Sequence, residues 1–299
     1  MSTTMSPTMS MKRALVLGAN GTLGQALCAY LPTAEAGSWQ VEARDRGGCD
    51  IANPAEVERA LTESRAEVVF NTAAFTNVDR AEDDPEGAFR ANALAPEILA
   101  EAVERHGAKL LHYSTDFVFD GERPRAYDEF DPPTPQGLYA RSKVAGEQLA
   151  AAATRRLFVM RVGCLYGRNG KNFPSTILRR LRAGETIRAD RERVGSPTWV
   201  MDVARVSAAL AVTGHFGLYH GTSQGETSWA DYARFLAAEL GLPAERVVGQ
   251  ATHELPMMKA PRPRRAILDN RMLRLRGLDL FPEWQAAARA FLRSETPAP

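Results

Sequence analysis

The sequence has few cysteines and histidines, and this shortage excludes two kinds of structural site. Its three cysteines, Cys28, Cys49 and Cys164, are odd in number and far apart, and no Cys-x-x-Cys pair occurs. The five histidines form no cluster with metal-ligand spacing. We therefore expect neither a disulfide framework nor a bound metal, and reduced thiols in a cytoplasmic protein are the simplest interpretation.

Long apolar runs and an excess of charge are also missing. No apolar stretch approaches the roughly 18 residues that a membrane-spanning helix needs. Residues 1–10 lack the basic start and apolar run of a secretory signal, and we expect them to form a disordered tail. The formal net charge is only +1 in 299 residues, so neither a nucleic acid nor a membrane surface is an expected partner.

What the sequence does contain is an alternation of short apolar strands and helical segments. This alternation predicts an α/β fold with a doubly wound parallel sheet of the Rossmann type, covered by helices on both faces. We expect residues 11–167 to form this domain, with 197–225 returning to it, and 168–196 and 226–299 to form a smaller α/β substrate lobe. The predicted strands are 14–17, 40–43, 67–70, 108–113 and 157–162, and the helices between them are 25–31, 54–63, 85–105 and 139–154.

A glycine-rich turn joins the first predicted strand to the first helix. Gly18, Gly21 and Gly24 occur there, with Asn20 between the first two. Glycine is needed where such a turn is tight and where the main chain must approach a pyrophosphate closely. The helix that follows offers N–H groups and a positive dipole end to phosphates. The turn therefore predicts a dinucleotide site, although the glycine triplet alone could be structural.

An acidic residue after the second predicted strand supports this prediction. Asp45 lies about 20 residues beyond the turn, where a carboxylate that binds the cofactor ribose is expected. Arg44 and Arg46 flank it, and they could bind a 2′-phosphate or lie in a solvated turn. The pattern leaves NADPH and NADH open as cofactors and favours NADPH.

Tyr139 and Lys143 are the strongest candidates for catalysis. A spacing of four residues places both on one face of a predicted helix. A nearby ammonium favours the phenolate, so we expect Lys143 to lower the tyrosine pKa from its usual value of about 10, which suits proton delivery to a carbonyl oxygen. A Tyr and a Lys occur at this spacing by chance often enough that the spacing alone does not identify a catalytic pair. Thr115 adds a hydroxyl at a strand end, where sites of open α/β sheets lie.

The Gly-x-x-Gly-x-x-Gly spacing resembles the extended short-chain dehydrogenase/reductase superfamily. Within it, longer segments resemble the dTDP-4-dehydrorhamnose reductase family, over about residues 12–292. The specific segments are NTAAFTNVDRAE (71–82), HYSTDFVFDG (112–121), YARSKVAGE (139–147) and RVGCLYG (161–167), while GSPT (195–198) and RPRRAIL (262–268) match less specifically.

The resemblance implies reduction of the 4-keto group of dTDP-4-dehydro-6-deoxy-L-mannose to dTDP-L-rhamnose, a precursor of cell-surface polysaccharide, with NADPH or NADH. It implies Tyr139 as the proton donor, Lys143 as its pKa modulator and ribose ligand, and Thr115 as a tuning hydroxyl. Asp116 would contact the sugar, and Asn92 matches an asparagine that orders a helix and a proton-relay water in many members. Cofactor contacts are implied at Gly21, Thr22 and Leu23 for the phosphates, Asp50 and Ile51 for the adenine, and Ala73, Ala74 and Thr76 elsewhere.

Two residues depart from the family pattern. Phe117 stands where the family often has Tyr, and Cys164 stands where it has a Trp. A Trp stacks on a sugar face and a Cys does not, so we expect Cys164 at the substrate with the exact sugar left open. The acidic residues that bind magnesium at a dimer interface in some members have no clear counterpart here. No metal is therefore predicted, and a homodimer stays open.

Two other functions also stay open, and Phe117 argues against a third. A sugar-nucleotide 4,6-dehydratase needs a further acid/base pair, usually Asp-Glu, but Phe117 follows Asp116 and transfers no proton. An epimerase of the superfamily would use the same Tyr–Lys pair with a tightly held NAD. A regulatory subunit would bind the nucleotide without catalysis, which the intact catalytic residues disfavour. The basic segment 259–276 is expected to be mostly solvated surface, with one or two arginines on the substrate pyrophosphate.

Overall fold

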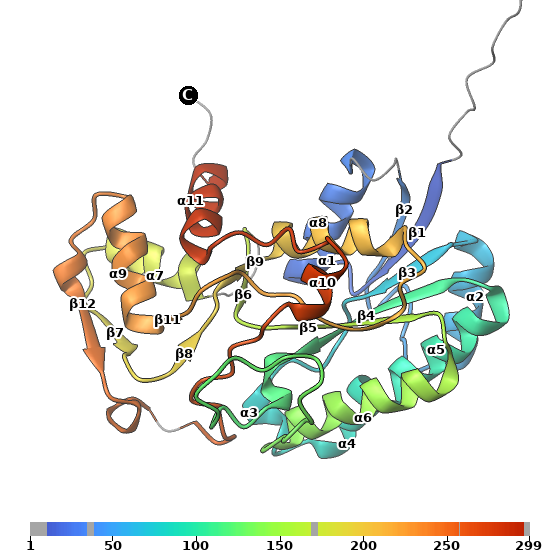
Figure 1. Ribbon diagram of the computed structural model, residues 1–299, viewed down its shortest axis with the longest axis horizontal. Coiled ribbons are helices and arrows are strands. Elements are labelled where there is room, and N and C mark those ends of the chain that lie inside the picture. The colour runs from blue at the N-terminus through green and yellow to red at the C-terminus, as the bar shows by residue number, and fades with distance from the viewer. Residues whose placement is uncertain (1–10, 35–38, 169–172, 257, 296–299) are drawn as a thin grey trace, which may run out of the picture.

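The computed structural model describes residues 11–34, 39–168, 173–256 and 258–295. The segment 1–10, for which we predict disorder, lies outside them. Figure 1 shows a larger lobe built on a twisted sheet and a smaller lobe of helices and short strands at the other end of the long axis.

A six-stranded parallel sheet forms the centre of the larger lobe. Its strand order is β2-β1-β3-β4-β5-β10, so the chain winds outward from β1 in both directions. Ligands of such sheets bind at the carboxyl ends of the strands, where the winding direction switches. The strands are β1 (Lys12–Leu17), β2 (Trp39–Arg44), β3 (Val68–Asn71), β4 (Lys109–Thr115), β5 (Leu157–Val162) and β10 (Gly217–His220).

Helices cover both faces of this sheet, which confirms the doubly wound fold. α1 (Thr22–Tyr30) and α8 (Val200–Ala211) pack on one face, against Val16 and its neighbours. α2 (Pro54–Ser64), α5 (Ala95–His106) and α6 (Leu138–Ala153) lie along the other face (Figure 1). Leu15 and Leu17 point to that second face because successive side chains of a strand alternate.

In the structure, the segment predicted as one helix, 85–105, is divided into three elements. α4 (Pro85–Phe89) leads into a π-helical segment, η2 (Arg90–Leu94), and then into α5; a short helix, α3 (Val78–Ala81), precedes them. Pro96 has no N–H to donate to the carbonyl of Asn92, so the regular ladder of α-helical hydrogen bonds is broken there. Such π-helical turns are frequent at functional sites.

The smaller lobe has an aromatic core and little sheet. Tyr166, Tyr232, Trp284 and Phe291 pack together in it. Ser228 caps α9, accepting a hydrogen bond from the main-chain N–H of Asp231 at 3.0 Å. Its elements are α7 (Phe173–Arg182), α9 (Trp229–Glu239) and α11 (Trp284–Glu295), with the strand pairs β7 (Ile187–Asp190) with β12 (Val247–Gln250) and β8 (Val194–Gly195) with β11 (Thr227–Ser228). β6 (Leu165–Tyr166) pairs with β9 (Thr198–Trp199), and α10 (Arg271–Leu275) packs on β10.

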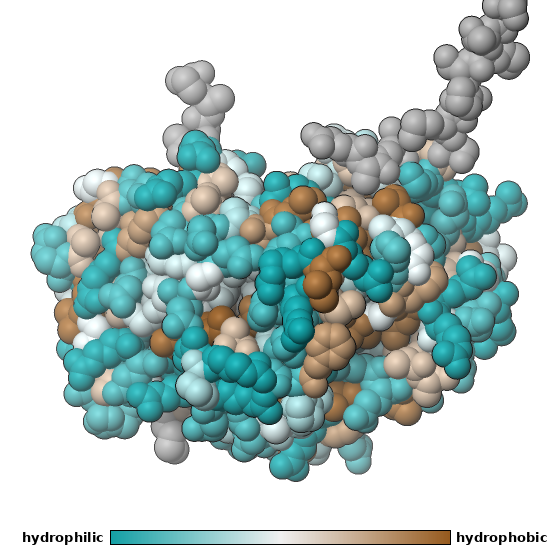
Figure 2. Space-filling model, viewed as in Figure 1, coloured by the Kyte–Doolittle hydropathy of each residue, from teal (hydrophilic) through white to brown (hydrophobic). Residues whose placement is uncertain are grey.

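On the face of the molecule that Figure 2 shows, apolar residues lie among a larger number of hydrophilic ones. Figure 2 shows a face that is mostly hydrophilic, with brown apolar residues in small groups. Across the described part of the chain, no helix combines the length and apolar character needed to cross a membrane. Within those same residues, histidine, cysteine and acidic side chains form no group of three or more that could hold a metal ion.

Candidate active site

The glycine turn lies at the carboxyl end of β1. Gly18 has a φ of +78°, and its main-chain N–H donates to the carbonyl oxygen of Arg44 at 2.9 Å, which ties the turn to the end of β2. A Cβ atom at Gly18 would lie 2.6 Å from the main-chain nitrogen of Ala73, so no larger residue fits. The turn is thus a main-chain cradle, and α1 starts directly behind it, as phosphate binding requires.

A cavity of about 490 Å³ opens beside this turn. The carboxylate of Asp45 borders it and accepts hydrogen bonds from Asn20 Nδ2 at 2.6 Å and from the main-chain N–H of Gly47 at 3.0 Å. The structure therefore joins two predicted cofactor residues, Asn20 and Asp45, in one contact. The cavity is lined by Ala19, Asn20, Ala43, Arg44, Asp45, Gly48 and Glu63.

The two arginines beside Asp45 have different surroundings. Arg44 lies between two carboxylates, donating from Nε to Glu42 at 2.7 Å and from Nη2 to Glu63 at 2.7 Å. Arg46 is exposed. The guanidinium of Arg44, which lines the cavity, is thus already paired. Arg46 is not among the lining residues, but it is exposed next to Asp45 and is the better candidate to meet a 2′-phosphate there.

The other predicted cofactor residues also lie at the carboxyl ends of strands. Asp50 and Ile51 follow β2; Ile51 is buried, and Asp50 accepts from Arg90 Nη2 at 2.8 Å. Thr72, just after β3, donates from Oγ1 to the carbonyl oxygen of Leu17 at 2.7 Å, which holds the two strand ends together. The segment after β3 carries Ala73, Ala74 and Thr76, and the first turn of α1 carries Thr22, Leu23 and Gly24.

α6 carries Tyr139 and Lys143 at its start, as predicted. Lys143 is 2% exposed, and its Nζ donates to the carbonyl oxygen of Tyr113 in β4 at 2.6 Å. Burial lowers the pKa of Lys143 to about 8, although the negative charge of Glu147 opposes this shift. Lys143 is therefore an amine that gains and loses a proton near neutral pH.

The pKa of Tyr139 does not follow the prediction from sequence. Burial raises it to about 12; a hydrogen bond with Thr115 lowers it, and the charge of Asp116 adds to the rise. The expected lowering by Lys143 is wrong for this structure, because the lysine amine is turned to the Tyr113 carbonyl. Tyr139 consequently keeps its proton across the neutral range, which is the form that a proton donor needs.

Thr115 and Asp116 lie beside Tyr139 at the end of β4. Thr115 Oγ1 donates to Asp116 Oδ1 at 3.0 Å and accepts from the main-chain N–H of Phe117 at 3.2 Å. Asp116 is 6% exposed, and burial raises the pKa of its carboxyl to about 7. A hydroxyl, a phenol and a carboxyl that gains or loses its proton around neutral pH are thus gathered at one strand end.

The raised pKa of Asp116 predicts a pH-dependent loss of stability. A carboxyl with a folded-state pKa of about 7 and an ordinary value of 3.8 stabilises the fold at acid pH, and this stabilisation is lost as the pH rises between those values. We expect Asp116→Asn to flatten the fall in the free energy of unfolding over that range, measured by urea denaturation. Glu122→Gln, at an exposed side chain, should leave the fall unchanged. Equal slopes in wild type and Asp116→Asn would contradict the burial argument.

Comparison with known proteins decides the family. The family model described as the RmlD substrate binding domain matches residues 11–296. The chain belongs to this family. The resemblance inferred from the sequence is therefore confirmed.

Curated and solved relatives agree with this membership. The dTDP-4-dehydrorhamnose reductase of Mycobacterium tuberculosis is 38% identical over 288 residues, which cover 92% of this chain and 91% of the relative. The crystal structure of dTDP-4-dehydrorhamnose reductase from Bacillus anthracis in complex with NADP has a TM-score of 0.90 at 34% identity, covering 95% of this chain and 99% of that one. A UDP-glucose 4-epimerase from Thermus thermophilus with NAD, at 23% identity, 96% and 100% coverage and a TM-score of 0.80, shows a likeness of fold alone.

Cys164 and Phe117 lie beside the residues predicted for catalysis. The ring of Phe117 packs edge-on against that of Tyr139, with centroids 5.9 Å apart. Cys164 follows β5 with a φ of +51°, and its sulfur lies against Gly195. Burial, together with the charge of Asp116, raises the pKa of the Cys164 thiol well above its usual value. Cys164 thus offers a neutral, compact surface beside Asp116.

Sequence reasoning missed two buried polar residues of this site, Asn71 and His112. Both are 1% exposed, and they are neighbours in register on β3 and β4. Asn71 Nδ2 lies 3.1 Å from His112 Nδ1, and His112 Nε2 lies 3.5 Å from Lys143 Nζ. The available signal was a polar residue next to a buried apolar run in each strand: Asn71 ends VVFN, and His112 follows the two leucines of KLLHYST.

Asn92 joins three parts of the RmlD-family site. Its Nδ2 donates to the carbonyl oxygen of Phe75 and to Ser142 Oγ, both at 3.0 Å, and its Oδ1 accepts from the main-chain N–H of Phe75 at 2.8 Å. The residue therefore ties the π-helical segment to α6 and to the chain after β3. Its role in a proton-relay water stays a prediction.

The basic segment 259–276 is largely paired with carboxylates. Arg262 lies 2.9 Å from Asp79 of α3, and Arg265 lies 2.7 Å from Glu226. Pairs of this kind on a surface stabilise little. They do show that these side chains have protein partners, and the pair of Arg262 with Asp79 joins the C-terminal part of the chain to the larger lobe. Further pairs are Lys259 with Asp83, Arg271 with Asp128 and Arg274 with Asp269.

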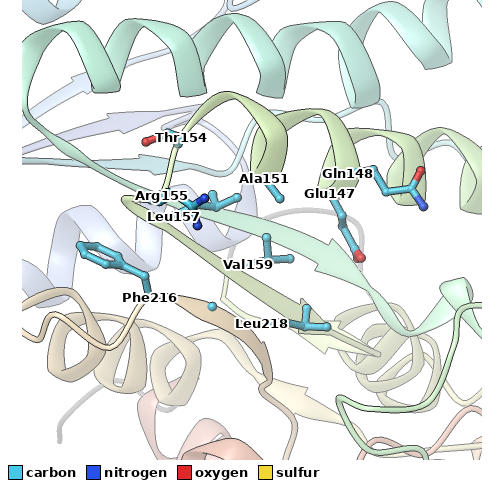
Figure 3. Close-up of a pocket in the computed structure, with 10 residues that line it drawn as sticks. Glu147, Gln148, Ala151, Thr154, Arg155, Leu157, Val159, Phe216 and Leu218 are labelled. Atoms are coloured by element: carbon cyan, nitrogen blue, oxygen red, sulfur yellow. The ribbon is translucent and has the colours of Figure 1, made fainter.

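A second cavity, of about 420 Å³, lies away from these residues. Figure 3 shows Ala151 of α6, Val159 of β5 and Leu218 of β10 around it. These positions belong to the later half of α6 and to the edge of the sheet, whereas Tyr139 lies at the opposite end of that helix. The cavity is therefore separate from the predicted catalytic residues.

Proposed function

We propose that this protein is a dTDP-4-dehydrorhamnose reductase that uses NADPH to convert dTDP-4-dehydrorhamnose to dTDP-L-rhamnose. The observation that carries the proposal lies at the carboxyl end of the sheet, where the glycine turn also lies. There α6 places Tyr139 in a hydrogen bond with Thr115 and the buried Lys143 in one with the carbonyl of Tyr113. The names of the M. tuberculosis and B. anthracis relatives, and the NADP in the latter structure, support it.

In this reaction NADPH supplies the hydride to C4 of the keto sugar. Tyr139 Oη, which keeps its proton across the neutral range, donates that proton to the C4 oxygen as its charge develops. Thr115 Oγ1 holds the phenol in place through their hydrogen bond. Lys143, with a pKa of about 8, then suits restoring the proton that Tyr139 has lost.

Substrate and cofactor would meet between the two lobes. We assign cofactor binding to residues 11–167 with 197–225, and substrate binding to 168–196 and 226–299 with Asp116 and Cys164. Asp116, whose pKa of about 7 leaves both forms present near neutral pH, is suited to donate a hydrogen bond to a sugar oxygen as well as to accept one. Cys164 would contact the sugar but, unlike the Trp of the family pattern, would not stack on its face.

A preference for NADPH should depend on Arg46. We expect Arg46→Ala to raise the KM for NADPH about tenfold, because one charge-assisted contact to the 2′-phosphate is worth about 1.5 kcal/mol or more. The KM for NADH, which has no such phosphate, should stay as in wild type. Steady-state kinetics with both cofactors measure this. An equal change in the KM for NADPH and in the KM for NADH would show that Arg46 is not the phosphate ligand.

The reaction itself is tested by turnover of an enzymatically prepared keto-sugar nucleotide. We expect oxidation of NADPH with dTDP-4-dehydrorhamnose and formation of dTDP-L-rhamnose. Turnover only with a different 4-keto sugar nucleotide would keep the reductase class and reject this substrate. Cofactor binding without any turnover would favour a regulatory subunit, and NAD that copurifies would favour an epimerase.

Two finer assignments accompany the proposal. We place the reductase in the cytoplasm, where its free thiols would stay reduced. A homodimer is proposed from the family resemblance, and sedimentation velocity with and without magnesium tests it: a monomer under both conditions would reject the dimer.

A further inference from the structure

A chain of buried polar groups runs from the cofactor turn to the catalytic lysine. It begins at the main-chain N–H of Ala73, which donates to Asn71 Oδ1 at 3.2 Å and lies next to Gly18. It continues through Asn71 Nδ2 to His112 Nδ1 at 3.1 Å, and ends with His112 Nε2 at 3.5 Å from Lys143 Nζ. The three side chains are all 1–2% exposed, so water does not compete for their contacts.

The first contact in this chain fixes the direction of the others. A main-chain N–H only donates, so the Asn71 atom that faces Ala73 is the oxygen and the atom that faces His112 is the NH2 group. His112 Nδ1 must then accept. Burial lowers the pKa of His112 far below its usual value, so the ring is neutral. A neutral ring that accepts at Nδ1 carries its hydrogen on Nε2.

That Nε2–H group points toward Lys143. An ammonium has only N–H donors, so a protonated Lys143 would face His112 donor to donor. An uncharged amine has a lone pair that accepts from the imidazole, while one of its own N–H groups still donates to the carbonyl of Tyr113 at 2.6 Å. The arrangement thus stabilises one protonation state of Lys143 over the other.

The charged groups around Lys143 do not cancel this effect. On α6, Glu147 lies one turn further along, but Arg161 of β5 binds both of its oxygens, at 3.0 and 2.7 Å. At the end of β4, Asp116 acts on Tyr139 and Cys164. His112 is the group of β4 whose side chain meets the lysine amine directly.

We propose that His112 is a positioning residue of the catalytic pair: Asn71 holds it as the Nε2–H tautomer, and that N–H group favours the uncharged amine of Lys143. This proposal rests on the proposed reductase function. It gives the enzyme a lysine that exchanges protons near working pH, where general acid–base groups act best. It also links the cofactor turn at Gly18 to the lysine through Ala73 and Asn71.

The tautomer is tested without any substrate. In 15N-labelled protein, long-range proton–nitrogen correlation spectra distinguish the two neutral tautomers of histidine. We expect the signal that disappears in His112→Phe to be that of an Nε2–H ring that does not titrate across the neutral range. In Asn71→Asp, a carboxylate oxygen replaces the NH2 group that faces His112 Nδ1. Because that oxygen only accepts, the ring should change to the Nδ1–H form. An Nδ1–H ring in the wild type would overturn the proposal, whatever reaction the enzyme catalyses.

The consequence for Lys143 is tested by the pH profile of kcat/KM for reduction. Asn71→Asp should move its alkaline limb up by about one pH unit or more, because an accepting Nε2 favours the ammonium. His112→Phe removes the N–H group that faces Lys143, and it should move the alkaline limb up by less than Asn71→Asp does. Ser114→Ala, two residues along the same strand, should leave the limb in place.

A double variant separates the tautomer from the new negative charge. A charge at residue 71 acts on Lys143 through space and needs no imidazole, whereas the tautomer change does. We expect the shift caused by Asn71→Asp to shrink at least by half in the His112→Phe background. An equal shift in both backgrounds would assign it to charge and overturn the role of His112. If neither the wild type nor any variant turned over the substrate, the reductase function would be rejected. The NMR result on the His112 tautomer would still hold, because that measurement needs no substrate.

Discussion

Tyr139→Phe should lower kcat for reduction about a thousandfold and leave NADPH binding intact. Proton transfer by a positioned acid is worth roughly 10² to 10⁴ in rate, and Phe has no proton to give. The Phe side chain keeps the ring that packs against Phe117, so the site should keep its shape. Single-turnover rates measure the chemical step, and NADPH fluorescence titration measures cofactor affinity.

The matched control for this prediction is Tyr219→Phe. Tyr219 is also buried, and its hydroxyl donates to the carbonyl of His215 near the start of β10, away from Tyr139. We expect this variant to lose about 1 kcal/mol of stability from one hydrogen bond, with kcat within a few fold of wild type. Full activity in Tyr139→Phe would refute the assignment of the proton donor.

Gly146→Ala should destabilise the protein by about 2–3 kcal/mol, the upper part of the range for overpacking, and lower kcat as well. A Cβ at Gly146 would lie 1.9 Å from the carbonyl oxygen of Asn92, in the π-helical segment that α6 packs against. The nearest atoms all belong to the main chain of Asn92 and Ala93 and cannot rotate away. The helix α6 therefore has to move, and it carries Tyr139 and Lys143. Urea denaturation and steady-state kinetics measure the two effects.

Gly214→Ala controls for the general effect of replacing glycine. A Cβ there would meet no atom within 4 Å among the residues that the structure describes, and the change should leave both stability and kcat near wild type. A Gly146→Ala protein with unaltered stability would show that α6 and the π-helical segment do not need the close approach.

The sheet and the position of the catalytic pair followed from local patterns in the sequence. Short apolar runs separated by helices predicted β1, β3, β4 and β5, because a strand buried on both faces must be apolar throughout. The spacing of Tyr139 and Lys143 placed them on one helix, and the glycine turn and Thr115 placed the predicted site at the carboxyl ends of the strands. Such features depend on residues close together in the chain, so sequence periodicity reports them.

What the sequence did not predict depends on contacts between distant segments. Arg44 is paired with Glu63 from α2, and this pairing leaves Arg46 as the better phosphate ligand. The pKa of Tyr139 is set by burial, since the amine of Lys143 is held by a carbonyl of β4. The contact between Asn71 and His112 requires β3 and β4 to be paired in a particular register. No local pattern contains that register.

The most direct test of the proposed reductase function follows the hydride. NADPH that carries deuterium at the transferred position of C4 of its nicotinamide would be incubated with the protein and dTDP-4-dehydrorhamnose, and the product analysed by NMR and mass spectrometry. We predict deuterium at C4 of the sugar in dTDP-L-rhamnose, at one atom per NADPH oxidised. Product without deuterium, or with deuterium at another carbon, would contradict the account.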